Sequence, residues 1–163
     1  MRRILLLLLL FVVTPTATAE EVDAERYTVN QIVNNEKAPT GVIFAVREYD
    51  EDALVWVLPR VEKYMREIRK NHPDISIAMM SHGDELVSLS NTRLKEYNRM
   101  HKLLKKLVTE ENLRFHICGT MAEMNGLGVD DFPEYVDVVP FGPSQVEDYI
   151  NLGYVLIDLE LTW

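Results

Sequence analysis

The segment Val42-Ile43-Phe44-Ala45-Val46 is an unbroken apolar run that begins directly after Gly41. A run of this length without alternation is typical of a strand inside a parallel sheet that is covered on both faces. The next segment has a different period, with four apolar residues at helical spacing between residues 61 and 68. Pro59 suits a first helical turn, so we expect one buried helix from there to Asn71.

The alternation of strand-like and helix-like segments continues to the end of the chain. We predict strands at 75–80, 113–118, 136–140 and 154–161, and helices at 92–108, from 120 to 126 or 128, and at 144–153. Neighbouring parallel strands need crossover connections, and these are usually helices. The sequence therefore predicts an α/β fold, a three-layer sandwich with a mostly parallel five-stranded sheet.

Two short motifs indicate where helices begin. Thr120-Met121-Ala122-Glu123 and Ser144-Gln145-Val146-Glu147 both have the form of a capping box. In that motif the hydroxyl accepts from an amide of the first turn, while the glutamate accepts from the amide of the cap residue. We expect one helix to start at each motif.

The N-terminus has the pattern of a secretory signal. A basic start is followed by an apolar run at 4–13 and by small residues at 16–19, so we expect residues 1–19 to be cleaved. The apolar run is about half the roughly 20 residues that a membrane-spanning helix needs. Residues 20–40 are polar and are predicted to be a surface arm, and 41–163 to form one domain. The implied location is the periplasm.

Composition excludes several partners. Removing 19 of the 163 residues leaves 144, the usual size of one domain. The formal net charge changes from −9 to −11 because Arg2 and Arg3 are lost with the signal. A field of this sign repels phosphate backbones and anionic lipid, so we expect neither nucleic acid nor a membrane as a partner of the mature chain.

Cys118 is the single cysteine of the chain and ends a predicted strand. A thiolate there could be stabilised by the amides that open the following helix, those of Gly119 and Thr120. His116 shares a strand face with Cys118 by the period-two rule, and His82 follows another strand. Either histidine could assist a reactive thiol. These residues form the candidate catalytic site.

Other interpretations of the same residues stay open. A lone cysteine is often a small buried hydrophobe, which would leave a non-catalytic oligomeric scaffold. Cys118, His116 and His82 are also residue types that bind zinc or copper, so a metal-binding module is an alternative. Acidic residues in the adjacent loops, at 84–85 and 130–131, would oppose ionisation of the thiol.

Cofactor motifs are missing from the sequence. It contains no Gly-x-Gly-x-x-Gly, no phosphate-binding Gly-x-x-x-x-Gly-Lys, no Cys-x-x-Cys and no His-Glu-x-x-His. We therefore expect no nucleotide cofactor and no zinc-peptidase chemistry, and predict no resident cofactor.

Three segments resemble the DsrE/DsrF-like family. They are Ser81-His82-Gly83, Phe115-His116-Ile117-Cys118-Gly119-Thr120-Met121, and the region from Val138-Val139-Pro140-Phe141-Gly142-Pro143-Ser144 to Gly153-Tyr154-Val155-Leu156-Ile157. The resemblance covers roughly residues 41–159. It implies one α/β domain that assembles into trimers or hexamers.

The same resemblance implies a chemistry for Cys118. In the sulfur-relay members of the family, the cysteine after the third strand carries sulfur as a persulfide, and that cysteine corresponds to Cys118. With one cysteine in the chain, the sulfur donor and the acceptor thiol must both be other molecules. The relay members work in the cytosol, whereas this chain carries an export signal.

Overall fold

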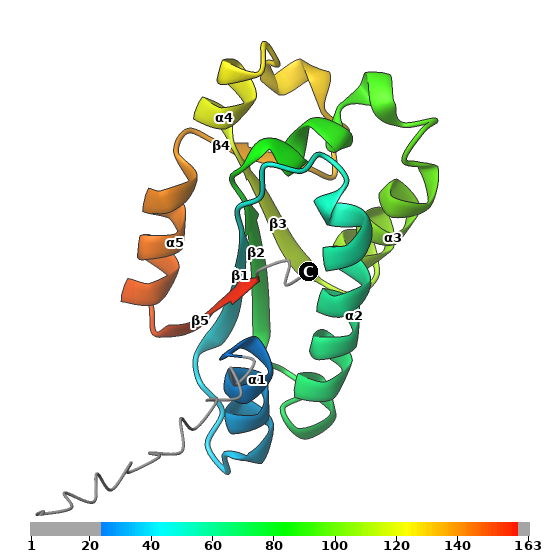
Figure 1. Cartoon of the computed structure of the whole chain (residues 1–163). Helices are drawn as coiled ribbons and strands as arrows, with labels where there is room; N and C mark the ends of the chain where they lie inside the picture. The colour runs from blue at the N-terminus through cyan, green and yellow to red at the C-terminus, as the bar shows by residue number, and fades with distance from the viewer. Residues whose placement is uncertain (1–23, 160–163) are drawn as a thin grey trace, which may run out of the picture.

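The computed structural model describes residues 24–159, and in it five parallel strands form one sheet (Figure 1). The strand order is β4-β3-β2-β1-β5, and every neighbouring pair is parallel. The strands are β1 (Gly41–Val46), β2 (Ser76–Ser81), β3 (Leu113–Cys118), β4 (Asp137–Val139) and β5 (Tyr154–Leu159). The predicted α/β sandwich is confirmed, with a sheet that is parallel throughout.

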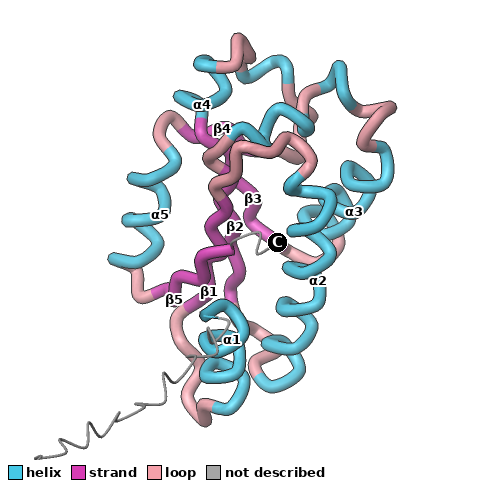
Figure 2. Tube along the Cα trace, viewed as in Figure 1, coloured by secondary structure: helices cyan, strands magenta, loops and turns pink. Residues whose placement is uncertain are grey.

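Helices cover both faces of this sheet unequally (Figures 1 and 2). The helices are α1 (Ala24–Asn34), α2 (Ala53–Asn71), α3 (Asn98–Thr109), α4 (Gly119–Met124) and α5 (Gly142–Asn151), with 3-10 turns η1 (Asp84–Leu89), η2 (Asn91–Arg93) and η3 (Val129–Asp131). Helices α1, α2 and α3 pack on one side, and α5 lies on the other. No helix within residues 24–159 is long and apolar enough to cross a bilayer.

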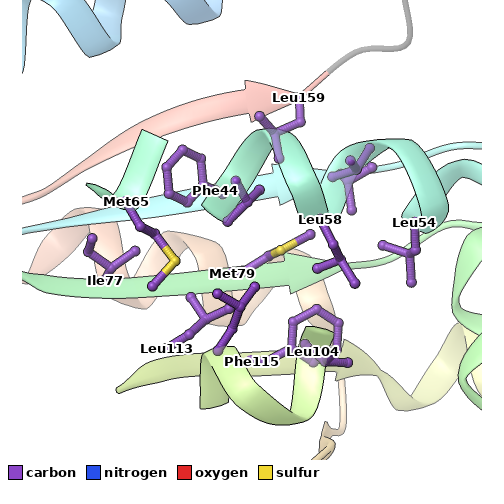
Figure 3. Packing of buried hydrophobic residues seen from close by; sticks show 14 of the residues in the cluster. Phe44, Leu54, Leu58, Met65, Ile77, Met79, Leu104, Leu113, Phe115 and Leu159 are labelled. Carbon is purple, nitrogen blue, oxygen red and sulfur yellow. The ribbon is translucent and has the colours of Figure 1, made fainter. Parts of the chain in front are cut away.

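The main core lies between the sheet and helices α2 and α3 (Figure 3). Strand β1 is buried along its whole length, as its apolar run predicts. Phe44 points into the main core, while its neighbour Ile43 points to the smaller cluster beneath α5. Each fully buried side chain of this size contributes roughly 1.5–3 kcal/mol to stability. Period-two alternation thus assigns each strand residue to one of the two helical layers.

The segment expected to be a surface arm contains helix α1 instead. Val29 and Ile32 are buried in the main core, and Val33 packs against it. These three residues lie at i, i+3 and i+4, so one stripe of the helix is apolar although the segment as a whole is polar. Helix α1 contacts α2 and β5 and belongs to the same folded unit. The predicted signal, residues 1–19, lies outside the described residues.

Helix α2 begins six residues before the predicted start. Pro59 lies inside it rather than in its first turn, and Leu54, Val57 and Leu58 extend the buried stripe upstream. An internal proline removes one helical hydrogen bond and costs about 3 kcal/mol. Burial of three large apolar side chains outweighs that cost.

The predicted helix at 92–108 is shorter, because its first part forms the 3-10 turn η2 and a further turn at 94–97. Helix α3 starts at Asn98. Upstream, Ser88 Oγ donates to Glu85 O, and the hydroxyls of Ser90 and Thr92 bond each other. Serine and threonine that bond locally in this way compete with helical hydrogen bonds.

Candidate functional site

The carboxyl ends of four strands surround one small cavity of about 270 Å³. Its lining residues come from the ends of β1, β2 and β3 and from the segments that follow β3 and β4. They are Arg47, His82, Cys118, Thr120, Met121, Phe141 and Pro143. Open parallel sheets bind ligands at this edge, because the loops there are free to vary while the strands hold them in place. The sequence places Cys118 and His82 here, and the structure brings both into one cavity.

Cys118 is the last residue of β3 and one of the residues that line the cavity. It is 1% exposed, whereas Phe141 is 50% exposed and Arg47 is also exposed at the rim. Cys118 therefore contributes almost no outer surface, and the cavity is the opening at which it lies. Burial alone therefore does not make this cysteine a core residue.

The amide of Gly142 donates a hydrogen bond to Cys118 Sγ, with an N···S distance of 3.3 Å. Gly142 is the first residue of α5, so the positive end of a ten-residue helix meets the sulfur. An unpaired helical amide and the helix dipole both favour negative charge at this position. Anion stabilisation was expected from α4, but the Thr120 amide donates to Pro140 O instead, and Gly119 begins a helix of six residues.

Close packing at Gly142 explains why this position has no side chain. A Cβ built there would lie 3.0 Å from His82 Cβ, 3.0 Å from Met80 Sδ and 3.1 Å from Cys118 Cβ. A glycine lets the first turn of α5 approach β2 and β3 closely enough for its amide to reach the sulfur.

Neither predicted capping box forms. Helix α4 has Cys118 at its N-cap and α5 has Phe141, and neither cap bonds through a side chain. Thr120 Oγ1 donates to Pro140 O, which ties the start of α4 to the end of β4. Pro143 occupies the first turn of α5, where a missing amide hydrogen costs nothing. Strand-to-helix contacts, rather than local caps, set where these helices begin.

His82 forms one wall of the cavity. Its backbone amide donates to Val46 O, which fixes the loop after β2 to the end of β1. Burial lowers the pKa of the His82 ring, the nearby Arg47 charge lowers it further, and Asp158 opposes both effects. The ring is therefore neutral at physiological pH, and a neutral imidazole can accept a proton from a thiol.

Arg47 is the cavity residue that sequence reasoning missed. It follows β1 directly, and it continues the period-two face on which Ala45 lies. In the sheet register, Ala45 pairs with Met80, which pairs with His116. Two residues further along each strand, on the same face, lie Arg47, His82 and Cys118. The same alternation that placed His116 beside Cys118 would have found Arg47, once the strand order was known.

His116 shares the strand face of Cys118 but is used elsewhere. Its Nδ1 lies 2.7 Å from Asp137 Oδ2 and its Nε2 lies 2.9 Å from Tyr149 Oη. Both ring nitrogens therefore have partners, and His116 does not line the cavity. Tyr149 belongs to α5, so this histidine connects β3 and β4 to the helix that covers them.

Glu85 holds the loops that carry Arg47 and His82. Its buried carboxyl accepts hydrogen bonds from Ser81 Oγ, the Gly83 amide and the Glu48 amide, at 2.7, 3.0 and 2.8 Å. Burial raises the pKa of this carboxyl, although the three hydrogen bonds oppose the shift. The acidic residues expected to disfavour a thiolate do not line the cavity.

The three residues that could bind a metal do not gather at one site. Within residues 24–159, no group of three or more His, Cys, Asp or Glu side chains is placed to hold a metal ion. His116 is directed to Asp137 and Tyr149, which leaves Cys118 and His82 in the cavity. We do not carry this alternative further.

Comparisons with known proteins support the fold alone. No family model matches the sequence, and no curated protein matches it. MTH1491 from Methanobacterium thermoautotrophicum, a protein of unknown function, has a similar structure, with a TM-score of 0.58 and 22% identity over 72% of this chain and 97% of that chain. The ychN protein from E. coli has a TM-score of 0.51 and 12% identity, over 73% and 99%. These likenesses show that the chain shares the fold of both proteins.

Proposed function

We propose that this protein is a DsrE-like sulfur carrier that holds sulfane sulfur as a persulfide on Cys118. The observation that carries the proposal is the position of Cys118, which is one of the residues that line a cavity and whose Sγ accepts a hydrogen bond from the first amide of α5. The sequence resemblance to sulfur-relay proteins and the DsrE-like fold add support.

The chemistry requires a thiolate and a sulfane donor. The thiolate sulfur attacks the terminal sulfur of a polysulfide, a new S–S bond forms, and the shortened polysulfide leaves with the bonding electron pair. In this proposal His82, which lines the same cavity, accepts the thiol proton before the attack. The Gly142 amide, which donates to Sγ, stabilises negative charge on the attacking thiolate.

Release of the sulfur needs a second thiol. An acceptor thiolate attacks the outer sulfur, which leaves Cys118 as a thiolate again, so no net oxidation or reduction of the protein occurs. Because the chain has a single cysteine, that thiol belongs to a partner protein or a small molecule. We place this exchange in the periplasm, after cleavage of residues 1–19, in an assembly of three or six chains.

Intact mass spectrometry tests the proposal. Purified protein is incubated with inorganic polysulfide and then weighed, and Cys118→Ser serves as the control. The expected product gains one sulfur atom, about 32 Da, loses it on addition of a small thiol, and does not form in Cys118→Ser. If native protein gains no such mass and its thiol also resists a maleimide, the non-catalytic scaffold is the better description.

A further inference from the structure

The cavity around Cys118 contains one residue of fixed charge. Arg47 is a permanent cation, His82 is neutral because burial lowers its pKa, and no aspartate or glutamate belongs to the lining. The chain as a whole has a formal net charge of −9. A cationic cavity in an anionic protein indicates selection of the ligand by charge.

Arg47 is also available to a ligand. Its side chain forms no ion pair or hydrogen bond with another side chain within residues 24–159, and it is exposed at the rim. Asp158 is the acidic residue whose charge acts on His82, but it is not part of the lining. Glu85, on the adjacent loop, directs its carboxyl to Ser81, Gly83 and Glu48.

The other walls limit the size and character of the ligand. Met121, Phe141 and Pro143 make most of the remaining surface apolar. A volume of about 270 Å³ lies just below the range of roughly 300–1,000 Å³ that is usual for drug-sized ligands. Such a space suits a small anion with a polarisable body better than it suits a peptide segment.

We propose that the sulfur donor is a small anionic sulfane compound of the thiosulfate or polysulfide class, and that Arg47 selects it. This inference rests on the proposed function of Cys118. A guanidinium can bind two oxygens of a sulfonate group at once, and a sulfur chain can lie along Met121 and Phe141.

With thiosulfate, the transfer step balances without another reactant. The Cys118 thiolate attacks the sulfane sulfur, the S–S bond of thiosulfate breaks, and sulfite leaves with the electron pair. One monoanion and one dianion give a persulfide monoanion and a sulfite dianion, so charge is conserved. Arg47 lines the same cavity, and in this proposal its positive charge stabilises the charge that builds on the leaving sulfite.

Two thiol probes of different charge test this selection. The dianion 5,5′-dithiobis(2-nitrobenzoate) and the neutral 4,4′-dithiodipyridine both form a mixed disulfide with Cys118. We expect Arg47→Gln to lower the rate constant of the anionic probe, divided by that of the neutral probe, about tenfold. Attraction by one fixed charge acts on the anionic probe alone. In Arg47→Lys this ratio should lie between those of the native protein and Arg47→Gln. Added salt should lower the ratio in the native protein.

Arg66→Gln is the matched control, because it removes the same charge from an exposed position on α2. Equal ratios in Arg47→Gln and the native protein would overturn the inference, as would equal rates of persulfide formation from thiosulfate in the two. If the neutral probe still reacts in those variants, the carrier function stands without Arg47 selection. If neither probe reacts with native Cys118, the carrier function and the selection both fail.

Discussion

At the scale of single residues, the site depends on how closely Gly142 approaches Cys118. The period-two rule correctly placed His116 and Cys118 on one face of β3, and it placed His82 at the same edge of the sheet. It could not predict which helix supplies an amide to the sulfur, because Gly142 lies 24 residues further along the chain. That contact depends on the turn between β4 and α5, which carries no distinctive local signal.

Substitution of Gly142 by alanine tests this contact. The added Cβ would lie 3.0–3.1 Å from atoms of Met80, His82 and Cys118, so these neighbours or the start of α5 must give by a few tenths of an ångström. We expect a loss of about 1–3 kcal/mol in the free energy of unfolding, as for other overpacked sites, measured in urea. The rate of Cys118 alkylation by iodoacetamide should also fall.

Gly128→Ala is the control for that substitution. Gly128 has a φ of −103°, and its added Cβ would meet only Asp131 Oδ2 at 3.8 Å. Stability and alkylation should change little in this variant. Equal behaviour of the two alanine variants would show that close packing at Gly142 does not govern the site.

At the scale of elements, α5 is held at two points of β3. Its first residue contacts Cys118, and Tyr149, two turns later on the same side of the helix, bonds His116. Sequence predicted a helix in this region and the face of β3 that it covers. It could not predict that His116 would pair with Tyr149 rather than assist Cys118. Tyr149 lies 33 residues away along the chain, whereas Cys118 lies only two residues away.

Tyr149→Phe removes the hydroxyl that bonds His116 and keeps the ring. We expect a loss of about 1 kcal/mol, the usual net value of one hydrogen bond, together with slower reaction of Cys118 with a small disulfide. Tyr154→Phe is a matched control, because Tyr154 lies on β5 rather than α5. Its hydroxyl donates to Ser76 Oγ of β2, at 2.8 Å. Equal slowing in both variants would contradict a positioning role for His116.

Glu85 stabilises the loops after β1 and β2 in a pH-dependent manner. Because its folded pKa is raised above the unfolded value, its contribution to stability is largest below about pH 4.5 and falls as pH rises through the folded pKa. Glu85→Gln leaves one buried amide without an acceptor, at a cost of about 1–3 kcal/mol. The loss of stability caused by Glu85→Gln, relative to the native protein, should therefore shrink as pH rises from about 5 towards neutrality.

Urea unfolding at several pH values in that range measures the deficit. Glu62→Gln is the comparison, because the hydrogen bond from Lys106 lowers the folded pKa of Glu62 below its ordinary value of 4.5, so the carboxyl is ionised over most of this range in the folded and the unfolded chain alike. The loss of stability caused by Glu62→Gln should therefore stay nearly constant with pH. A Glu85→Gln deficit that grows with pH would contradict the raised pKa.

At the scale of the whole molecule, one sheet face is covered less completely than the other. Sequence predicted the sandwich from its alternating periods, but it missed α1, whose short apolar stripe lies among polar residues. Ile150 of α5 and the two residues that flank this helix, Phe141 and Leu152, are exposed by 44%, 50% and 66%. Large exposed apolar side chains beside a sparsely covered sheet face are typical of an interface.

We expect this surface to join copies of the chain, as the family resemblance implies. Sedimentation equilibrium should give a trimer or a hexamer for the native protein. Replacing Ile150 and Leu152 by glutamate should dissociate it without unfolding, because charged groups would then lie in the contact. Val129→Glu, at a residue that is 68% exposed on η3, should leave assembly unchanged. A native protein that sediments as a monomer would contradict this expectation.

The most direct test of the account is the labelling rate of Cys118 by a small neutral disulfide, measured at increasing urea concentrations below the unfolding transition. If the thiol reacts through its cavity, the native protein is labelled in buffer and the rate stays nearly constant across this range. A protein that resists labelling in buffer, and reacts only in proportion to its unfolded fraction, would contradict the claim that Cys118 is the reactive centre.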